Sequence, residues 1–154
     1  MQRTSAGIAL YRRTPQGVEM LLVHPGGPYF AAKDRGAWSF PKGEYEEGED
    51  PLTVARRELA EETGVNVEGD FVSLGSSRQA SGKVVSLWAV EGDCDAAAIR
   101  SNTFLMEWPP RSGRQAEFPE VDRAEWFTPA MAKDKLNPGQ VSFVDRLLEH
   151  LALG

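Results

Sequence analysis

GEYEEGEDPLTVARRELAEETGV, residues 43–65, crowds acidic side chains into a stretch whose own pattern predicts a helix. Asp50 followed by Pro51 is typical of a helix start, with an N-cap side chain and a proline in the first turn. Apolar and small residues then recur at helical spacing until Gly64, which is typical of a helix end. We therefore expect a helix of about three turns that begins at Pro51.

Three carboxylates share one face of this predicted helix. At about 100° per residue, Glu58, Glu61 and Glu62 lie within roughly 100° of one another. Glu58 and Glu62 are one turn apart and repel, so they do not stabilise the helix on their own account. Oxygen donors of this kind suit Mg²⁺, which takes carboxylates, water and phosphate oxygens as ligands. The cluster indicates a metal-phosphate ligand, and the alternative is a solvated acidic face that favours solubility.

The spacing of the residues in this stretch resembles the complete signature of the Nudix hydrolase family. The matching positions are Gly43, Glu49, Arg57, Glu58, Leu59, Glu61, Glu62, Gly64 and Val65. Outside this box, only the succession of strands around the helix is similar to the family. The resemblance implies an α/β protein with the Nudix fold, an α/β/α sandwich around a mixed central sheet, and we expect residues 1–154 to form a single Nudix hydrolase domain.

The resemblance also implies a chemistry. Nudix enzymes hydrolyse a nucleoside diphosphate linked to another group X, with Mg²⁺ or Mn²⁺ as the cofactor and water attacking phosphorus. The family's catalytic and metal-binding glutamates map onto Glu58, Glu61 and Glu62, and a further metal ligand, a backbone carbonyl, maps onto Lys42. Glu58 and Glu62 would hold the main metal, while Glu61 would bind a second ion or orient and deprotonate the water. Which glutamate is the general base stays open.

Four residues of the box are implied to be structural. Glu49 and Arg57 fit the family pattern of an ion pair that ties the loop to the helix. Gly43 and Gly64 would supply backbone freedom, Gly43 in the loop and Gly64 at the helix C-cap.

Substrate contacts must come from outside the box. WPPRSGRQAEFPE, residues 108–120, is rich in turn formers and predicts a loop long enough to form a lid. Arginine there suits phosphate, and a late glutamate would add a carboxylate to the site. The alternative is a solvated loop. The candidate substrate-binding residues are Arg111, Arg114, Glu117 and Glu120 in this loop, and Lys33 and Arg35 before the box.

Aromatic side chains are candidates for stacking on a nucleobase, although most aromatic residues in proteins belong to the core. These candidates are Tyr29, Phe30, Trp38 and Trp108. His24 and His150 are interpreted as ordinary strand-end and helix residues, because this chemistry does not require histidine.

The remaining pattern predicts several strands and a second helix. The apolar, partly β-branched runs at 5–13 and 18–24 predict a hairpin, because Pro15 and Gly17 lie between them. Residues 138–151 place apolar side chains on one stripe and predict a core-packing helix. Further strands are expected at 37–41, 71–79, 83–92, 103–108 and 123–128.

Composition narrows the function classes. The formal net charge of −6 argues against broad attraction to nucleic acid or to an anionic membrane surface. No apolar run approaches the roughly 20 residues of a membrane-spanning helix. Cys94 has no partner for an internal disulfide, and the first residues lack the apolar core of a signal peptide, so a cytoplasmic protein is expected.

These observations together favour a Mg²⁺-dependent pyrophosphohydrolase. The expected partner is a small nucleotide such as a nucleoside triphosphate or a dinucleoside polyphosphate, with no membrane partner, with nucleic acid disfavoured, and with the protein a monomer or a homodimer. The alternatives are a Nudix module that senses a nucleotide without cleaving it, and an RNA-cap hydrolase.

Overall fold

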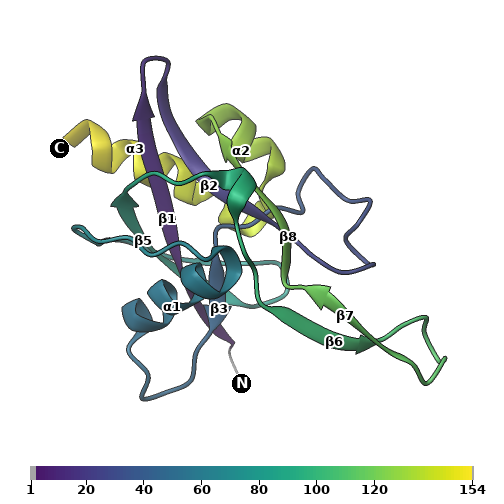
Figure 1. The fold of residues 1–154 in the computed structure, drawn as a ribbon. Helices are drawn as coiled ribbons and strands as arrows, with labels where there is room; N and C mark the ends of the chain where they lie inside the picture. Colours follow the sequence, from purple (N-terminus) through teal and green to yellow (C-terminus); the bar gives the residue numbers. More distant parts are fainter. Residues whose placement is uncertain (1–2, 154) are drawn as a thin grey trace.

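A computed structural model describes residues 3–153, which form a mixed central sheet covered by helices on both faces (Figure 1). The strands of the central sheet are β1 (Thr4–Thr14), β2 (Gly17–Pro25), β3 (Lys42–Glu44), β4 (Val72–Arg78), β5 (Val84–Glu91) and β8 (Val121–Phe127). A separate hairpin consists of β6 (Thr103–Glu107) and β7 (Gln115–Pro119). The helices are α1 (Pro51–Thr63), α2 (Pro129–Lys135) and α3 (Ser142–Leu153), with short 3-10 turns at Ala96–Ala98 and Pro138–Gln140.

The central position of β1 brings the acidic box onto the sheet. The strand order is β4-β5-β1-β2-β8, with β1 and β5 parallel and the other neighbours antiparallel. The short strand β3 pairs with the beginning of β1, with Gly7 opposite Lys42 and Ser5 opposite Glu44. The residues just before α1 are therefore held against the most buried strand of the protein.

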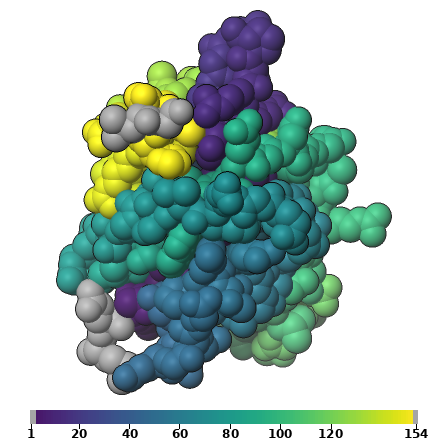
Figure 2. Space-filling view, turned by 90° about the vertical axis from the view of Figure 1, so that its left-hand side faces the viewer, coloured from purple at the N-terminus to yellow at the C-terminus, as the bar shows by residue number. Residues whose placement is uncertain are grey.

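Alternation along β1 divides the core into two layers. Ile8 and Leu10 pack with the apolar face of α1, whereas Ala9 and Tyr11 pack with α2 and α3. Successive side chains of a strand point to opposite faces, so a strand buried on both sides reads as one continuous apolar run. Figure 2 shows the β4–β5 region between α3 on one side and α1 with its preceding loop on the other. The expected α/β/α sandwich with a mixed sheet is confirmed.

The helix that carries the acidic box begins and ends where the sequence predicts. Asp50 is the N-cap, and its carboxylate accepts hydrogen bonds from the Thr53 backbone N–H at 3.1 Å and the Thr53 hydroxyl at 2.7 Å. Gly64 is the C-cap in the left-handed conformation, with φ of 78°, and its N–H donates to the Ala60 carbonyl at 2.7 Å. These local contacts fix the length of α1 independently of the rest of the chain.

Two predicted segments differ from the structure. Residues 37–41 do not form a strand: Trp38 and Ser39 make only isolated bridges, and Pro41 has no N–H to continue a ladder. The segment predicted as a loop at 108–120 instead contains β7, which pairs antiparallel with β6.

Helical structure near the C-terminus also differs in extent. α2 was not predicted, although Thr128 caps it as Asp50 caps α1 and a proline follows in the first turn. α3 begins at Ser142, because Pro138–Gln140 forms a 3-10 turn. None of the helices within residues 3–153 has the length and apolarity needed to cross a membrane.

Candidate active site

The acidic side chains of α1 meet the backbone of β3. The Lys42 backbone N–H donates to Glu62 Oε2 at 3.1 Å. Beside it, Gly43 faces the Glu58 carboxylate so closely that a Cβ built on Gly43 would lie 2.1 Å from Glu58 Cδ. Gly43 does not lie in the left-handed region of φ, so close approach, and not a positive φ, is what favours glycine there. This position favours glycine, because the Glu58 carboxylate occupies the space that a side chain would fill.

Burial sets the electrostatics of this cluster. Burial of the carboxylate raises the pKa of Glu62 to about 8, although the hydrogen bond from Lys42 opposes the shift. Burial, followed by the negative charge of Glu61, raises the pKa of Glu58. Burial lowers the pKa of the Lys42 ammonium, while the nearby carboxylates, Glu62 first, oppose this shift. Both shifts toward neutral carboxyl groups indicate a site short of positive charge.

Glu120 joins the same group from a distant part of the chain. Partial burial and the charge of Glu61 raise the pKa of this largely exposed carboxylate, and Glu120 in turn raises the pKa of Glu58 and Glu62. Its backbone is held firmly, because its N–H donates to the Asn102 carbonyl at 2.8 Å while the Asn102 N–H donates to the Glu61 carbonyl at 2.8 Å. Two backbone hydrogen bonds thus connect α1 to Glu120.

Arg57 lies among the acidic residues as their main cation. Its guanidinium lies 3.6 Å from Glu49, 3.9 Å from Glu58 and 3.8 Å from Glu61. Glu49 also accepts a hydrogen bond from the Glu46 backbone N–H at 2.9 Å, which closes the loop before α1. Arg57 therefore connects the loop to the helix and lowers the repulsion between Glu58 and Glu61.

The carboxylate donors suit a hard divalent cation, but they do not lie close enough together to surround one. Glu58, Glu61, Glu62 and Glu120 offer only carboxylate oxygens, the ligands that Mg²⁺ and Mn²⁺ accept. Within residues 3–153, no three His, Cys, Asp or Glu side chains lie close enough together to hold a metal ion as they stand. Metal binding would therefore require the carboxylates to draw together, against a repulsion that only the cation removes.

The other sequence-predicted substrate residues are scattered. Arg35 is bound to Asp134, with Nε 2.8 Å from Oδ1, so its guanidinium is engaged elsewhere. Lys33 Nζ lies 5.1 Å from the centroid of the Phe30 ring. Arg111 and Arg114 lie at the far end of the β6–β7 hairpin, and Glu117 is on its exposed face. Among these candidates, Glu120 interacts electrostatically with the glutamates of α1.

One aromatic candidate needs correction, whereas His24 lies at the end of β2 as predicted. Trp38 is 1% exposed and belongs to the core, so it is not available to a base. His24 is fully buried, with Nδ1 2.8 Å from Asp122 Oδ1 and Nε2 2.6 Å from the Lys33 carbonyl. His24 therefore connects the loop after β2 to β8. Its partner Asp122 is 98 positions away, so no local pattern indicates this role.

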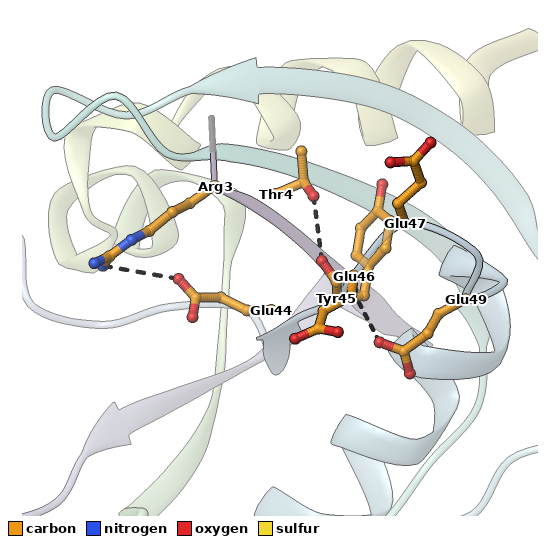
Figure 3. A pocket seen from close by; sticks show the side chains of 7 residues that line it. All are labelled: Arg3, Thr4, Glu44, Tyr45, Glu46, Glu47 and Glu49. Atoms are coloured by element: carbon orange, nitrogen blue, oxygen red, sulfur yellow. Dashed lines mark hydrogen bonds and ion pairs between the residues drawn. The ribbon is translucent and has the colours of Figure 1, made fainter. Parts of the chain in front are cut away.

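A pocket of about 650 Å³ opens beside the loop before α1 (Figure 3). Its lining is mostly acidic, and its one arginine, Arg3, lies 3.9 Å from Glu44. The lining residues are Arg3, Thr4, Glu44, Tyr45, Glu46, Glu47 and Glu49. Such a surface repels a polyphosphate, and none of the glutamates of α1 lines it, so the pocket is a poorer candidate for the substrate than the carboxylate cluster.

Comparison with known proteins identifies the family. The NUDIX domain model matches residues 1–147, and the chain belongs to the Nudix family. An RNA pyrophosphohydrolase from Roseobacter denitrificans is 46% identical over 55 residues, which cover 33% of this chain and 34% of that protein. A second, from Rhizobium meliloti, is 30% identical over 104 residues, covering 58% of this chain and 57% of that protein. The chain thus spans only about a third of the length of some curated relatives that it matches.

Solved structures share the fold at low sequence identity. An Ap4A hydrolase from C. elegans in a binary complex has a TM-score of 0.68 and 21% identity, covering 99% of both chains. The NUDIX domain of Shewanella oneidensis NrtR, solved with ADP ribose, has a TM-score of 0.68 and 19% identity, covering 98% of this chain and 89% of that one. These likenesses agree with the layers and the strand order described above.

Removal of charge at Glu62 should stabilise the metal-free protein at high pH. The folded-state pKa of Glu62 is raised from 4.5 to about 8, so its stabilising contribution is full below 4.5 and is lost as the pH rises through 8. In EDTA, we expect Glu62→Gln to melt no lower than the wild type at about pH 9, and its advantage should shrink toward about pH 6. A clearly lower melting temperature of Glu62→Gln at both values would instead give the cluster a structural role.

Proposed function

We propose that this protein is a divalent-metal-dependent pyrophosphohydrolase that cleaves a nucleoside diphosphate linked to another group. The observation that carries this proposal is the carboxylate cluster of α1, closed on one side by β3 and joined by Glu120. Burial of Glu62 beside Glu58 without a cation destabilises the fold, so stability alone does not explain this arrangement. Membership of the Nudix family supports the same chemistry.

The residues of the carboxylate cluster would have different roles. Glu58, Glu62 and the Lys42 carbonyl would hold Mg²⁺ or Mn²⁺, with Glu120 as a further carboxylate. Such an ion, when bound, supplies charge neutralisation for phosphate oxygens and a lower pKa for water. The Lys42 backbone N–H fixes the orientation of Glu62. Glu61 is more exposed than Glu58, with 37% against 15% of its side chain accessible, so it is the better placed to orient the attacking water and accept its proton.

A small nucleotide is the favoured substrate. The net charge of −6 and the acidic surface of the box loop oppose the long phosphate-tracking contacts that an RNA body needs. A second candidate is the triphosphate at an RNA 5′ end, because relatives that match the chain are RNA pyrophosphohydrolases.

A substrate panel tests the proposal and separates the candidates. The protein and Mg²⁺ are incubated separately with nucleoside triphosphates, dinucleoside polyphosphates, nucleotide sugars and 5′-triphosphate RNA, and the products are separated by chromatography. We expect phosphate products from one of these substrate classes. For a small nucleotide, KM should change by less than about tenfold between about 50 and 200 mM salt, because few phosphates are contacted. A much steeper dependence with RNA as the best substrate would favour the second candidate. If nothing is cleaved while nucleotides still raise the melting temperature, the protein is a nucleotide sensor.

A further inference from the structure

Two segments that are far apart in sequence meet beside Glu120. The loop of residues 26–37, between β2 and β3, approaches the β6–β7 hairpin through two glycines. A Cβ built on Gly26 would lie 2.0 Å from the Pro119 carbonyl oxygen, and one on Gly27 would lie 3.1 Å from Phe104 Cζ. The Gly26 N–H also donates to the Glu120 carbonyl at 2.9 Å. Only glycine allows this loop to lie so close to the hairpin and to the carboxylate cluster.

The face of the hairpin toward this loop is aromatic. Phe104, Met106 and Trp108 alternate with exposed residues along β6 and its end, and Phe118 lies opposite Phe104 in register. The Phe104 and Phe118 ring centroids are 6.1 Å apart. The hairpin, which extends away from the main sheet in Figure 1, thus presents a row of half-buried rings instead of a polar surface.

Tyr29 and Trp108 form an exposed aromatic corner at the end of this row. Their ring centroids are 5.5 Å apart and their planes meet at 85°. Tyr29 is 58% exposed and Trp108 is half-buried. An edge-to-face pair of this kind leaves ring faces free, and a flat ligand can stack on one ring while its edge meets the other.

The loop that carries Tyr29 is ordered in advance by buried contacts. His24 contacts the Lys33 carbonyl and Asp122 as described above, and the Lys33 N–H donates to the Phe30 carbonyl at 2.9 Å. A ring that is already positioned costs little ordering entropy when a ligand binds. These contacts hold the backbone on both sides of Tyr29, which limits the ordering that a ligand would have to impose on the loop.

Charge and position relate the aromatic corner to the carboxylate cluster. The exposed cations Lys33, Arg111 and Arg114 belong to the same two segments, beside the exposed acidic residues Asp34, Glu107 and Glu117. The five residues of β7 span about 17 Å, with Glu120 just beyond one end and the turn that carries Trp108 beyond the other. A base carried on an extended polyphosphate chain has the length and the charge to contact both ends.

We propose that the aromatic corner of Tyr29 and Trp108 stacks the base of a nucleoside polyphosphate whose phosphates reach the carboxylate cluster. This inference rests on the proposed function and names its substrate class. Stacking on aromatic side chains is strong for every base, because each base has a π-face, so the site selects for the presence of a base more than for its identity. The corner would thus favour nucleoside polyphosphates over base-free polyphosphates.

The test compares ligands with and without a base by calorimetric titration. The probes are diadenosine tetraphosphate and inorganic tripolyphosphate, each with Mg²⁺, and every protein titrated also carries Glu61→Gln, which removes the proposed general base so that cleavage adds no heat. We expect Trp108→Ala and Tyr29→Ala to weaken diadenosine tetraphosphate roughly tenfold or more and to leave tripolyphosphate unchanged. Trp108→Phe, which keeps a ring, should bind within about threefold of the wild type. Leu105→Ala is the matched control, because Leu105 is 66% exposed on the other face of the same hairpin.

The outcomes separate this inference from the proposed function. Equal binding of diadenosine tetraphosphate by the wild type and Trp108→Ala would overturn the stacking site, whether or not the protein hydrolyses it. Equal losses for both ligands would also overturn it, because they would show a general effect of the hairpin. Selective weakening of diadenosine tetraphosphate without any hydrolysis by the wild type would support the corner and contradict the proposed function.

Discussion

Glu62→Gln is expected to lose roughly 10²- to 10³-fold in turnover while it keeps the fold. Glutamine retains a carbonyl oxygen that accepts the hydrogen bond from the Lys42 backbone N–H, which is 3.1 Å from Glu62 Oε2. The packing of α1 on β3 should therefore survive. The substitution removes the negative charge that would bind the proposed cation. Because the side chain is buried, no other group replaces this charge. Turnover of the best substrate with saturating Mg²⁺, together with a circular dichroism spectrum, measures both effects.

Glu47→Gln is the matched control for this prediction. Glu47 is exposed, belongs to the same acidic loop and lines the separate pocket beside it. The control removes one carboxylate from the box without touching the cluster and should keep turnover within about twofold, because an exposed charge interacts weakly. Near-normal turnover of Glu62→Gln would remove this carboxylate from the mechanism.

Gly43→Ala is expected to lose most of the activity for a steric reason. The added Cβ would lie 2.1 Å from Glu58 Cδ and within 2.5 Å of both carboxylate oxygens, so Glu58 or β3 must move. The crowded atoms are the end of a flexible side chain that can rotate away, so the loss of stability should be smaller than the roughly 1–3 kcal/mol typical of an overpacked core. Displacement of Glu58 also places it wrongly for a metal ligand, so the loss of turnover should exceed what the loss of stability explains. Turnover and denaturant unfolding of the same samples test this.

Gly82→Ala separates steric crowding from backbone strain. Gly82 has a φ of +92° and no atom within 4 Å of a built Cβ, so alanine there is strained but meets nothing. We expect a stability loss of about 1 kcal/mol with turnover unchanged. If Gly43→Ala keeps its activity as Gly82→Ala does, the close approach of β3 to Glu58 has no catalytic importance.

The sequence predicts α1 and its acidic face because their signals are local. Asp50 caps the helix start, Gly64 ends it, and the 3.6-residue period alone brings Glu58 and Glu62 to one side. β1 and β2 are equally readable, because their apolar runs are long and a turn separates them. The Nudix spacing then adds a fold that these local signals do not determine.

Elements that depend on distant partners could not be predicted in this way. The three-residue strand β3 exists because β1 offers it a ladder, and β7 exists because β6 does, although Pro and Gly around β7 favour a loop. The spacing within the box likewise predicts that Gly43 supplies backbone freedom in a loop. In the structure, the Glu58 carboxylate occupies the space that a Gly43 side chain would fill.

The same limit applies to the residues around the cluster. Arg35 has the right charge for phosphate, but Asp134, which is bound to it, is 99 positions away. Tyr29 and Trp108 each resemble core residues in isolation, and only the path of the loop past Glu120 brings them together. Long-range contacts, which residue patterns do not encode, decide which polar and aromatic side chains are available to a substrate.

Mn²⁺ binding, measured by electron paramagnetic resonance in the absence of nucleotide, tests the metal site most directly, because it requires no knowledge of the substrate. The wild type and Glu47→Gln should bind the ion alike, whereas Glu58→Gln and Glu62→Gln should bind it at least about tenfold more weakly, because each removes a proposed charged ligand. Equal binding of Mn²⁺ by all four proteins would contradict the assignment of the α1 carboxylates as the metal site.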